Sequence, residues 1–151
     1  MSSLKNLNKP IGLASDHAGY EAKSYLISVL QDMGIKYKDF GTYSTESVDY
    51  TDYAHPLATA IESGEYRFGI AICGTGNGIN MTINKHQGIR AALCWNPDLA
   101  YFARAHNDAN VLSLPGRLLS KEELYEILKI FLNTPFEGGR HEQRINKISC
   151  G

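Results

Sequence analysis

The amino-acid sequence predicts an α/β protein in which helices cover both faces of a five-stranded parallel sheet. Short apolar runs alternate with stretches whose apolar residues recur at the helical period, as they do in chains built from strand–helix units. One run, Phe68–Cys73 (FGIAIC), is almost entirely apolar, which is typical of a central strand buried on both faces. The 151 residues contain no repeat and no linker, so we expect a single domain over residues 1–151, with residues 1–9 as a flexible N-terminus.

Composition and charge exclude several classes of protein. Hydrophobic residues make up 43% of the chain and charged residues 21%, which are values of a folded globular protein. The formal net charge of −1 gives no general attraction for nucleic acid, and no apolar run is long enough for a membrane span or a signal peptide. The three cysteines form no Cys-x-x-Cys pair. We therefore expect a cytoplasmic protein with reduced thiols and neither nucleic acid nor a membrane as a partner.

The first third of the chain predicts two strands with a helix between them. Ile11–Ser15 is a short apolar strand, and the apolar residues from Tyr25 to Met33 share one helical face that closes at Gly34. Ile35–Phe40 follows as the second strand, and the polar stretch Thr42–Thr51 follows as a loop.

The middle of the chain predicts a helix, the central strand and a second, shorter helix. The first helix covers Tyr53–Ile61, with Pro56 in its first turn, where the missing amide hydrogen is not needed. Phe68–Cys73 then leads through a glycine-rich turn into a short helix over Ile79–Lys85.

Two strands and a capped helix come next. A strand at Arg90–Cys94 precedes Asn96 and Pro97, which supply an N-cap and a proline at the first helical position. His106 shares the apolar face of this helix, and Asn110–Leu114 is the fifth strand.

The C-terminal part predicts two more helices. Ser120 and Glu123 form a capping box for a helix whose apolar face runs to Leu132 and which ends before Pro135. The polar segment Glu137–Lys147 predicts a last short helix.

The clearest chemical signal is the turn Cys73-Gly74-Thr75-Gly76-Asn77-Gly78, which directly follows the most apolar strand. Alternating glycines let the backbone curl so that several amides point to one place at the start of a helix, which favours binding of an anion. The turn lacks the third glycine of the dinucleotide-binding motif, since position 79 is Ile, and the Gly-Lys-Ser/Thr of a phosphate loop does not follow. The simpler alternative is a tight turn that needs its glycines only for geometry.

Cys73 stands at the start of this turn, where exposed amides and a helix N-terminus would stabilise a thiolate as a base or nucleophile. The alternative is a buried cysteine that ends a strand. Cys94 and Cys150 lack such surroundings, and we assign them to the core and to the tail.

Polar residues also follow the first strand and the fourth helix. Asp16 and His17 could bind hydroxyls and phosphate if their turn faces the glycine turn; alternatively Asp16 is an N-cap and His17 an exposed residue. His106, followed by Asn107 and Asp108, could act as a general acid or base near neutral pH, or could be a satisfied histidine on an inner helix face.

Arg140 and Arg144 lie four residues apart in the last helical segment. On a helix both guanidinium groups would project from one side and form a fork for a phosphate, and the alternative is a solvated basic face. The five histidines are scattered without His-x-x-x-His spacing, so we expect no metal site and no cofactor.

Together these segments resemble the type B ribose-5-phosphate isomerase family, within the wider group that includes galactose-6-phosphate isomerase subunits. The resemblance runs from Ile11 to about Ile148. It is carried by SDHAG at 15–19, ICGTGNGI at 72–79, NK with GIRAAL at 84–93, HNDANVL at 106–112 and GGRHEQR at 138–144.

The resemblance implies a Rossmann-like (flavodoxin-like) three-layer α/β/α sandwich whose C-terminal helix reaches a partner subunit. It implies a homodimer or tetramer with active sites between subunits. It also implies metal-free interconversion of ribose 5-phosphate and ribulose 5-phosphate, a step of the pentose phosphate pathway, through an enediolate.

The resemblance further implies a role for individual residues. Cys73 would move a proton between carbon 2 and carbon 1, and His106 would assist opening of the sugar ring. The amides from Gly74 to Gly78 would hold the enediolate, with Thr75 positioning or protonating it. The remaining substrate-binding residues would be Asp16, His17 and Asn107 for the sugar, Arg117, Arg140 and Arg144 for the phosphate, and Tyr50 as a further contact.

Two other functions stay open at this point. One is an isomerase for a six-carbon aldose phosphate, such as allose 6-phosphate or galactose 6-phosphate, and the other is a phosphosugar-binding module without catalysis. The thiol of Cys73, together with neutral Asn77 and Asn80, favours a thiol base over the carboxylate base that some relatives have in the glycine turn. The sets His106-Asn107-Asp108 and Arg140/Arg144 fit the ribose enzyme better than the galactose-6-phosphate isomerase subunits.

Overall fold

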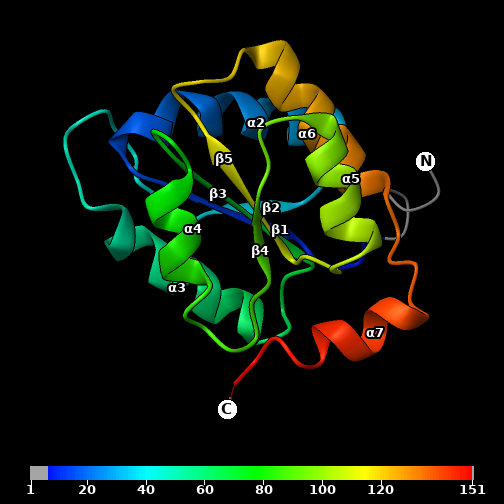
Figure 1. Cartoon of the computed structure of the whole chain (residues 1–151). Coiled ribbons are helices and arrows are strands. Elements are labelled where there is room, and N and C mark those ends of the chain that lie inside the picture. Colours follow the sequence, from blue (N-terminus) through cyan, green and yellow to red (C-terminus); the bar gives the residue numbers. More distant parts are fainter. Residues whose placement is uncertain (1–6, 151) are drawn as a thin grey trace.

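Five parallel strands form a single sheet within residues 7–150, the part of the chain that the computed structural model describes (Figure 1). The strands are β1 (Ile11–Ser15), β2 (Tyr37–Asp39), β3 (Phe68–Cys73), β4 (Ala91–Leu93) and β5 (Val111–Pro115). Their order is β2-β1-β3-β5-β4, and every pairing is parallel, as predicted. The flavodoxin-like order is 2-1-3-4-5, so here the last two strands have exchanged places. Of the expected flexible N-terminus, residues 1–6 lie outside the described residues.

The strand order reverses between β1 and β3. In open α/β sheets, ligands bind outside the carboxyl ends of the strands at such a point. β1 and β3 are paired over five residues, from Ile11 opposite Phe68 to Ser15 opposite Ile72. The turns that follow these two strands therefore begin side by side, which confirms that the turn after the first strand faces the glycine turn.

Helices cover both faces of the sheet, so the three-layer arrangement is confirmed (Figure 1). The helices on one face are α2 (Tyr20–Asp32), α5 (Pro97–Ala105) and α6 (Lys121–Asn133), and those on the other face are α3 (Tyr50–Glu62) and α4 (Asn77–Ile83). A short 3-10 helix, η1 (His17–Gly19), precedes α2.

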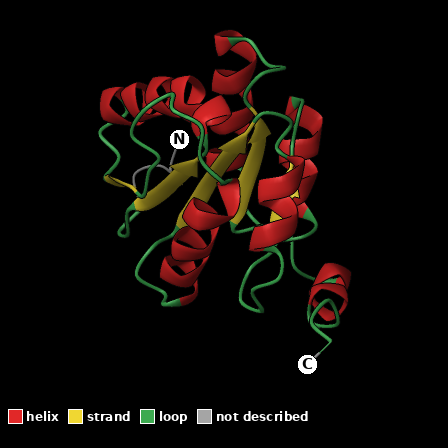
Figure 2. Cartoon of the chain, turned by 90° about the vertical axis from the view of Figure 1, so that its left-hand side faces the viewer, coloured by secondary structure: helices red, strands yellow, loops and turns green. Residues whose placement is uncertain are grey.

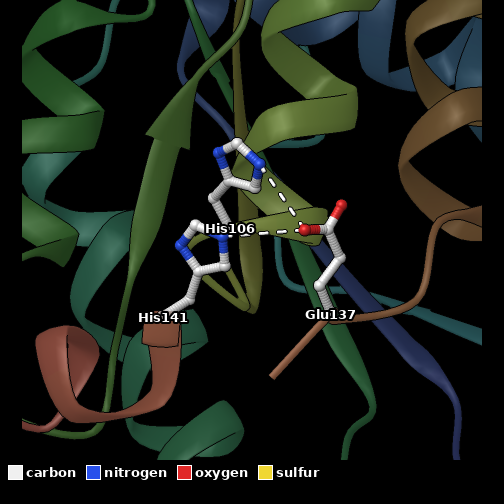
Figure 3. Close-up of side chains that lie close together, drawn as sticks. All are labelled: His106, Glu137 and His141. Carbon is white, nitrogen blue, oxygen red and sulfur yellow. Dashed lines mark ion pairs between the residues drawn. The ribbon is translucent and has the colours of Figure 1, made fainter. Parts of the chain in front are cut away.

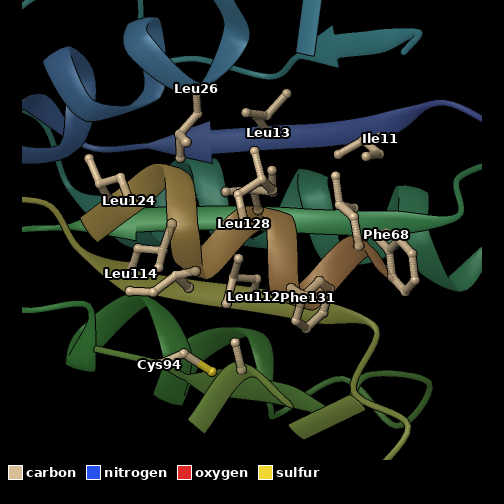
Figure 4. Packing of buried hydrophobic residues seen from close by; sticks show 14 of the residues in the cluster. Ile11, Leu13, Leu26, Phe68, Cys94, Leu112, Leu114, Leu124, Leu128 and Phe131 are labelled. Atoms are coloured by element: carbon tan, nitrogen blue, oxygen red, sulfur yellow. The ribbon is translucent and has the colours of Figure 1, made fainter. Parts of the chain in front are cut away.

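Two apolar clusters hold the layers together. On the α2, α5 and α6 face, Leu13, Leu128 and Phe131 are fully buried against the sheet (Figure 4). On the other face, Leu57 of α3 and Ile79 of α4 pack against the sheet's smaller side chains. Each such side chain contributes roughly 1.5–3 kcal/mol through burial, so these clusters fix the strand ends that carry the polar turns.

The predicted helix caps are confirmed. The side chain of Asn96 accepts a hydrogen bond from the Leu99 N–H at 2.9 Å, and Pro97 begins α5. Ser120 and Glu123 form the reciprocal capping box of α6, with distances of 3.1 and 2.9 Å.

Three helices begin earlier than the apolar pattern predicts. α2 starts at Tyr20, α4 at Asn77 and α3 at Tyr50. The prediction that Pro56 lies in the first turn of its helix is therefore wrong. The helix already includes the three residues before Tyr53, so the proline lies in the second turn. These first turns carry no apolar period, so the hydrophobic pattern could not reveal them.

The last helix, α7 (Arg140–Ile145), stands clear of the two helix layers (Figure 2). It lies inside the predicted segment 137–147, and whether it reaches a partner subunit stays a prediction. No helix within residues 7–150 combines the length and the apolar character needed to cross a membrane.

Candidate active site

The predicted site residues form two groups at opposite ends of the sheet. The first group, called here the strand-end group, follows the carboxyl ends of the strands, and the second, the His106 group, lies around the end of α5 and on α7. The strand-end group contains Asp16, His17, Tyr50, Cys73, Gly74, Thr75, Gly76, Asn77, Gly78 and Arg117, and the His106 group contains His106, Asn107, Arg140 and Arg144. β5 separates them and runs about 13 Å from Val111 to Pro115, at roughly 3.3 Å per residue. One chain therefore does not bring the two groups together.

Asp16 ties the turn after β1 to the end of β3. Its backbone N–H donates to the carbonyl of Ile72 at 3.3 Å, and its buried carboxylate accepts from the Gly19 N–H at 3.0 Å. Asp16 is therefore the N-cap of η1, as one of the two sequence interpretations has it, and it also lies at the switch point of the sheet.

The His17 ring is oriented by the loop before α3. Its Nδ1 accepts a hydrogen bond from the backbone N–H of Val48 at 3.2 Å. An amide can only donate, so Nδ1 carries no proton, and the neutral ring carries its proton on Nε2. His17 lines a pocket of about 450 Å³ together with Glu21, Thr45 and Arg117. The ring thus offers a donor at a pocket that also holds a guanidinium group.

The glycine turn after Cys73 carries backbone donors that the fold leaves unused. Cys73 is buried at the end of β3. The amides of Gly74, Thr75 and Gly76 donate to no acceptor among the described residues. Gly76 has a φ of +76°, and a Cβ there would lie 2.6 Å from Leu93, so this position requires glycine. The turn therefore presents several amide donors beside a thiol.

Arg117 and Tyr50 both lie against this turn. A Cβ on Gly74 would lie 3.4 Å from the Arg117 side chain, and a Cβ on Gly78 would lie 2.5 Å from the Tyr50 ring. The backbone N–H of Arg117 also donates to the Gly74 carbonyl at 3.0 Å. The structure thus places Tyr50, the first residue of α3, next to the glycine turn, and its role as a substrate contact stays a prediction.

In the second group, His106 is held by neighbours on two elements (Figure 3). It is the C-cap of α5, and its ring lies 4.9 Å from that of Phe102 and 4.2 Å from that of His141, the latter nearly parallel at 13°. Its Nε2 lies 3.7 Å from a carboxylate oxygen of Glu137.

Sequence reasoning missed His141 and Glu137. The His141 Nε2 lies 3.6 Å from the same Glu137 oxygen that His106 faces. Burial, His106 and Arg140 lower the pKa of His141. No local pattern marked these two residues, because each lies more than thirty positions from His106 in the sequence.

The ligand atoms of His106, Glu137 and His141 all lie within 4.8 Å of one another, which is close enough for a metal ion to be considered. The two imidazole rings are stacked, however, so the lone pairs of their nitrogens run side by side instead of converging. A metal ion lies in the plane of an imidazole that binds it. Both histidines could bind one ion only after a ring turned out of the stack.

The remaining members of the His106 group are exposed. The guanidinium groups of Arg140 and Arg144 form no ion pair or hydrogen bond with any described residue. Asn107 is exposed too, and its carbonyl accepts from Arg90 at 3.0 Å. Asp108, with a φ of +46°, completes this turn through a 2.7 Å ion pair with Arg104. Within the described residues, the His106 group thus offers the two unpaired guanidinium groups of α7 and, on a fixed turn, the side-chain amide of Asn107.

Comparison with known proteins covers nearly the whole chain. Residues 11–148 match the family described as Ribose/Galactose Isomerase. The ribose-5-phosphate isomerase B of Escherichia coli (strain K12) is 41% identical over 142 residues, which cover 94% of this chain and 95% of that protein.

Solved structures are similar over the same range. A ribose 5-phosphate isomerase from Thermotoga maritima is 52% identical with a TM-score of 0.91, covering 93% of this chain and 97% of that one. The ribose-5-phosphate isomerase B of Mycoplasma genitalium, whose structure holds ribulose-5-phosphate, is 38% identical with a TM-score of 0.90, covering 95% of both chains.

Proposed function

The chain belongs to the ribose/galactose isomerase family and is an enzyme, and we propose that it interconverts D-ribose 5-phosphate and D-ribulose 5-phosphate. The observation that carries this proposal is the buried thiol of Cys73 beside the unused amides of Gly74, Thr75 and Gly76. Isomerisation moves a proton between carbon 2 and carbon 1, so it needs a base at these carbons and donors for the oxygen that becomes negative.

In this reaction Cys73 is the base and the glycine turn stabilises the enediolate. The thiolate takes the proton from carbon 2, and the carbonyl oxygen on carbon 1 becomes the negative oxygen of the enediolate. The hydroxyl proton on the carbon 2 oxygen passes to the carbon 1 oxygen, and the thiol returns its proton to carbon 1 as the C2=O bond forms. A single donor in comparable oxyanion sites stabilises the transition state by about 3–4 kcal/mol, so the turn supplies a large share of the rate. The hydroxyl oxygen of Thr75 accepts from the Asn77 N–H at 3.3 Å, which leaves its proton free to donate to the substrate.

Ring opening requires a second proton carrier, and we assign it to His106 of a partner subunit. The anomeric hydroxyl loses its proton as the C1=O bond forms, the bond between C1 and the ring oxygen breaks, and that oxygen gains a proton. His106 lies at the other end of the sheet from Cys73 in its own chain. A homodimer, or a tetramer of such dimers, would bring the His106 group of one chain to the strand-end group of the other.

The phosphate is bound from both chains in the same arrangement. Arg117 and the Nε2–H of His17 line the pocket of one chain. Arg140 and Arg144, which are exposed and unpaired among the described residues, would come from the partner with Asn107. Guanidinium groups suit this task because their planar fork matches the phosphate oxygens. Binding of this remote group holds carbons 1 and 2 beside the thiol.

The proposed chemistry needs Cys73 as a free thiol. The three cysteines are unpaired, and Cys73 would lose its function on oxidation. A reducing compartment such as the cytoplasm therefore suits the enzyme.

Proton NMR in deuterated buffer with EDTA tests the proposal. Ribose 5-phosphate should give ribulose 5-phosphate that carries deuterium at carbon 1, because the enediolate exchanges with solvent. Product without deuterium would contradict the enediolate pathway with an exchanging base. If only allose 6-phosphate or galactose 6-phosphate turns over, the substrate assignment is wrong, and if ligands bind without any exchange, the chain is a binding module.

A further inference from the structure

We infer that Glu137 and His141 are positioning residues for His106, which hold its ring in place and make the three side chains take up one proton as a unit (Figure 3). This inference rests on the proposed role of His106 in ring opening. It concerns two residues for which neither the sequence motifs nor the proposed reaction supplies a role.

The backbone brings these side chains together from two elements. The N–H of Glu137 donates to the carbonyl of Ala105 at 2.9 Å, which fixes Glu137 at the end of α5 next to His106. Gly138 and Gly139 follow with φ values of +71° and +56°, and this turn carries the chain into α7 so that His141 stacks on the His106 ring. The His106 ring is thus confined by Phe102, by His141 and by the carboxylate.

The charges of the cluster favour one bound proton. A single oxygen of Glu137 faces the Nε2 of both rings, at 3.7 and 3.6 Å. One imidazolium is stabilised by this carboxylate, whereas a second would place two cations in rings that are 4.2 Å apart. Titrations of groups this close belong to the pair and occur in two separate steps.

The surroundings decide which ring takes the first proton. In the single chain the side chain of His141 is 10% exposed and that of His106 is 35% exposed, so His106 is the ring that remains open to water or to a substrate. Burial, the nearby His106 and the charges of Arg140 and Arg144 lower the pKa of His141, whereas Glu137 raises it. These surroundings disfavour a charge on His141, so we assign the proton that ring opening needs to His106.

Histidine NMR titration of the full-length protein, combined with the pH dependence of kcat/KM, tests the inference. In the unchanged protein, His106 should titrate before His141 as the pH falls, and each signal should respond to the other's step. In Glu137→Gln, both midpoints should move to lower pH by about one unit, because a carboxylate within 4 Å is lost. The limb of the kcat/KM profile that belongs to His106 should move by the same amount.

His141→Phe separates positioning from proton coupling. The phenyl ring keeps the stack on His106 but cannot bind a proton, so His106 should titrate in one simple step. Glu137 is exposed, so Glu137→Gln should remain folded even if His141→Phe does not. Identical His106 titrations in the unchanged protein and in Glu137→Gln would overturn the inference.

The chain offers a matched control in a second histidine–carboxylate cluster. His86 lies 2.9 Å from Glu62 and 2.8 Å from His55, between α3 and the turn after α4. Glu62→Gln makes the same chemical change there and should leave the His106 titration and the kcat/KM profile unchanged. The NMR titration does not depend on turnover, so a shift without any isomerase activity would contradict the proposed function but not this inference.

Discussion

At the scale of single residues, Cys73 and Cys94 show how position decides the chemistry of a thiol. Burial raises the pKa of Cys94 to about 12, so this thiol stays protonated and inert at neutral pH. Cys73 is buried as well, but it lies at the end of β3 where unused amides begin. The residue type is the same, and we propose a role in proton transfer for Cys73 alone.

Replacing Cys73 should separate catalysis from binding. Cys73→Ala removes the proposed base and should lower kcat by roughly 100-fold to 10,000-fold, the range for loss of general acid–base catalysis. Substrate affinity should stay within a few-fold, because phosphate and hydroxyl contacts remain. Cys150→Ala, in the exposed tail, serves as the control and should keep full activity. Steady-state kinetics and calorimetric binding measure both, and a kcat near that of the unchanged enzyme would exclude Cys73 as the base.

Arg140 should act mainly on binding. Its charge-assisted hydrogen bonds to phosphate are expected to contribute about 1.5–3 kcal/mol, so Arg140→Ala should raise KM roughly 10-fold to 100-fold. Lys147→Ala removes an exposed positive charge from the same C-terminal region and should change KM little. Equal KM values for the two variants would remove Arg140 from the phosphate site.

At the scale of elements, the features best predicted from the sequence were those that depend on contacts between residues close together in the chain. The caps of α5 and α6 were predictable because Asn96 and Ser120 contact backbone three residues ahead. The start of α3 at Tyr50 was not predictable from nearby residues, because Tyr50 packs against Gly78, which is distant in the sequence. The partners of His106 were missed for the same reason, since they are more than thirty residues away.

The capping box gives a prediction for stability at this scale. Ser120→Ala removes the side-chain acceptor for the Glu123 N–H and should lower the free energy of unfolding by about 1 kcal/mol. Ser120→Thr keeps the hydroxyl and should lose much less. Urea denaturation followed by circular dichroism measures both, and a Ser120→Ala protein as stable as the original would show that the cap contributes nothing.

At the scale of the whole molecule, the two groups of site residues predict trans-complementation. Cys73→Ala and His106→Ala should each be inactive alone. In a mixed dimer, the intact Cys73 of one chain meets the intact His106 of the other, so one of the two sites is restored. Random association at equal amounts should therefore recover about a quarter of full activity.

The mixing experiment has a clear control. If Cys73 and His106 acted on one substrate from the same chain, no mixture of the two variants would regain activity. At substrate concentrations well below KM, where Arg140→Ala loses most of its activity, a mixture of Cys73→Ala with Arg140→Ala should also regain activity, because Arg140 lies with His106. Unfolding and refolding the chains together ensures that subunits exchange.

Because α5 and α7 lie at the far end of the sheet from Cys73, the proposed reaction should depend on the concentration of the protein. In the proposed arrangement each chain folds around its own core, but a complete active site forms only between two chains. Below the dissociation constant of the dimer, turnover per chain would fall in proportion to protein concentration, although every chain stays folded. Specific activity measured across a dilution series thus becomes a direct assay of subunit association.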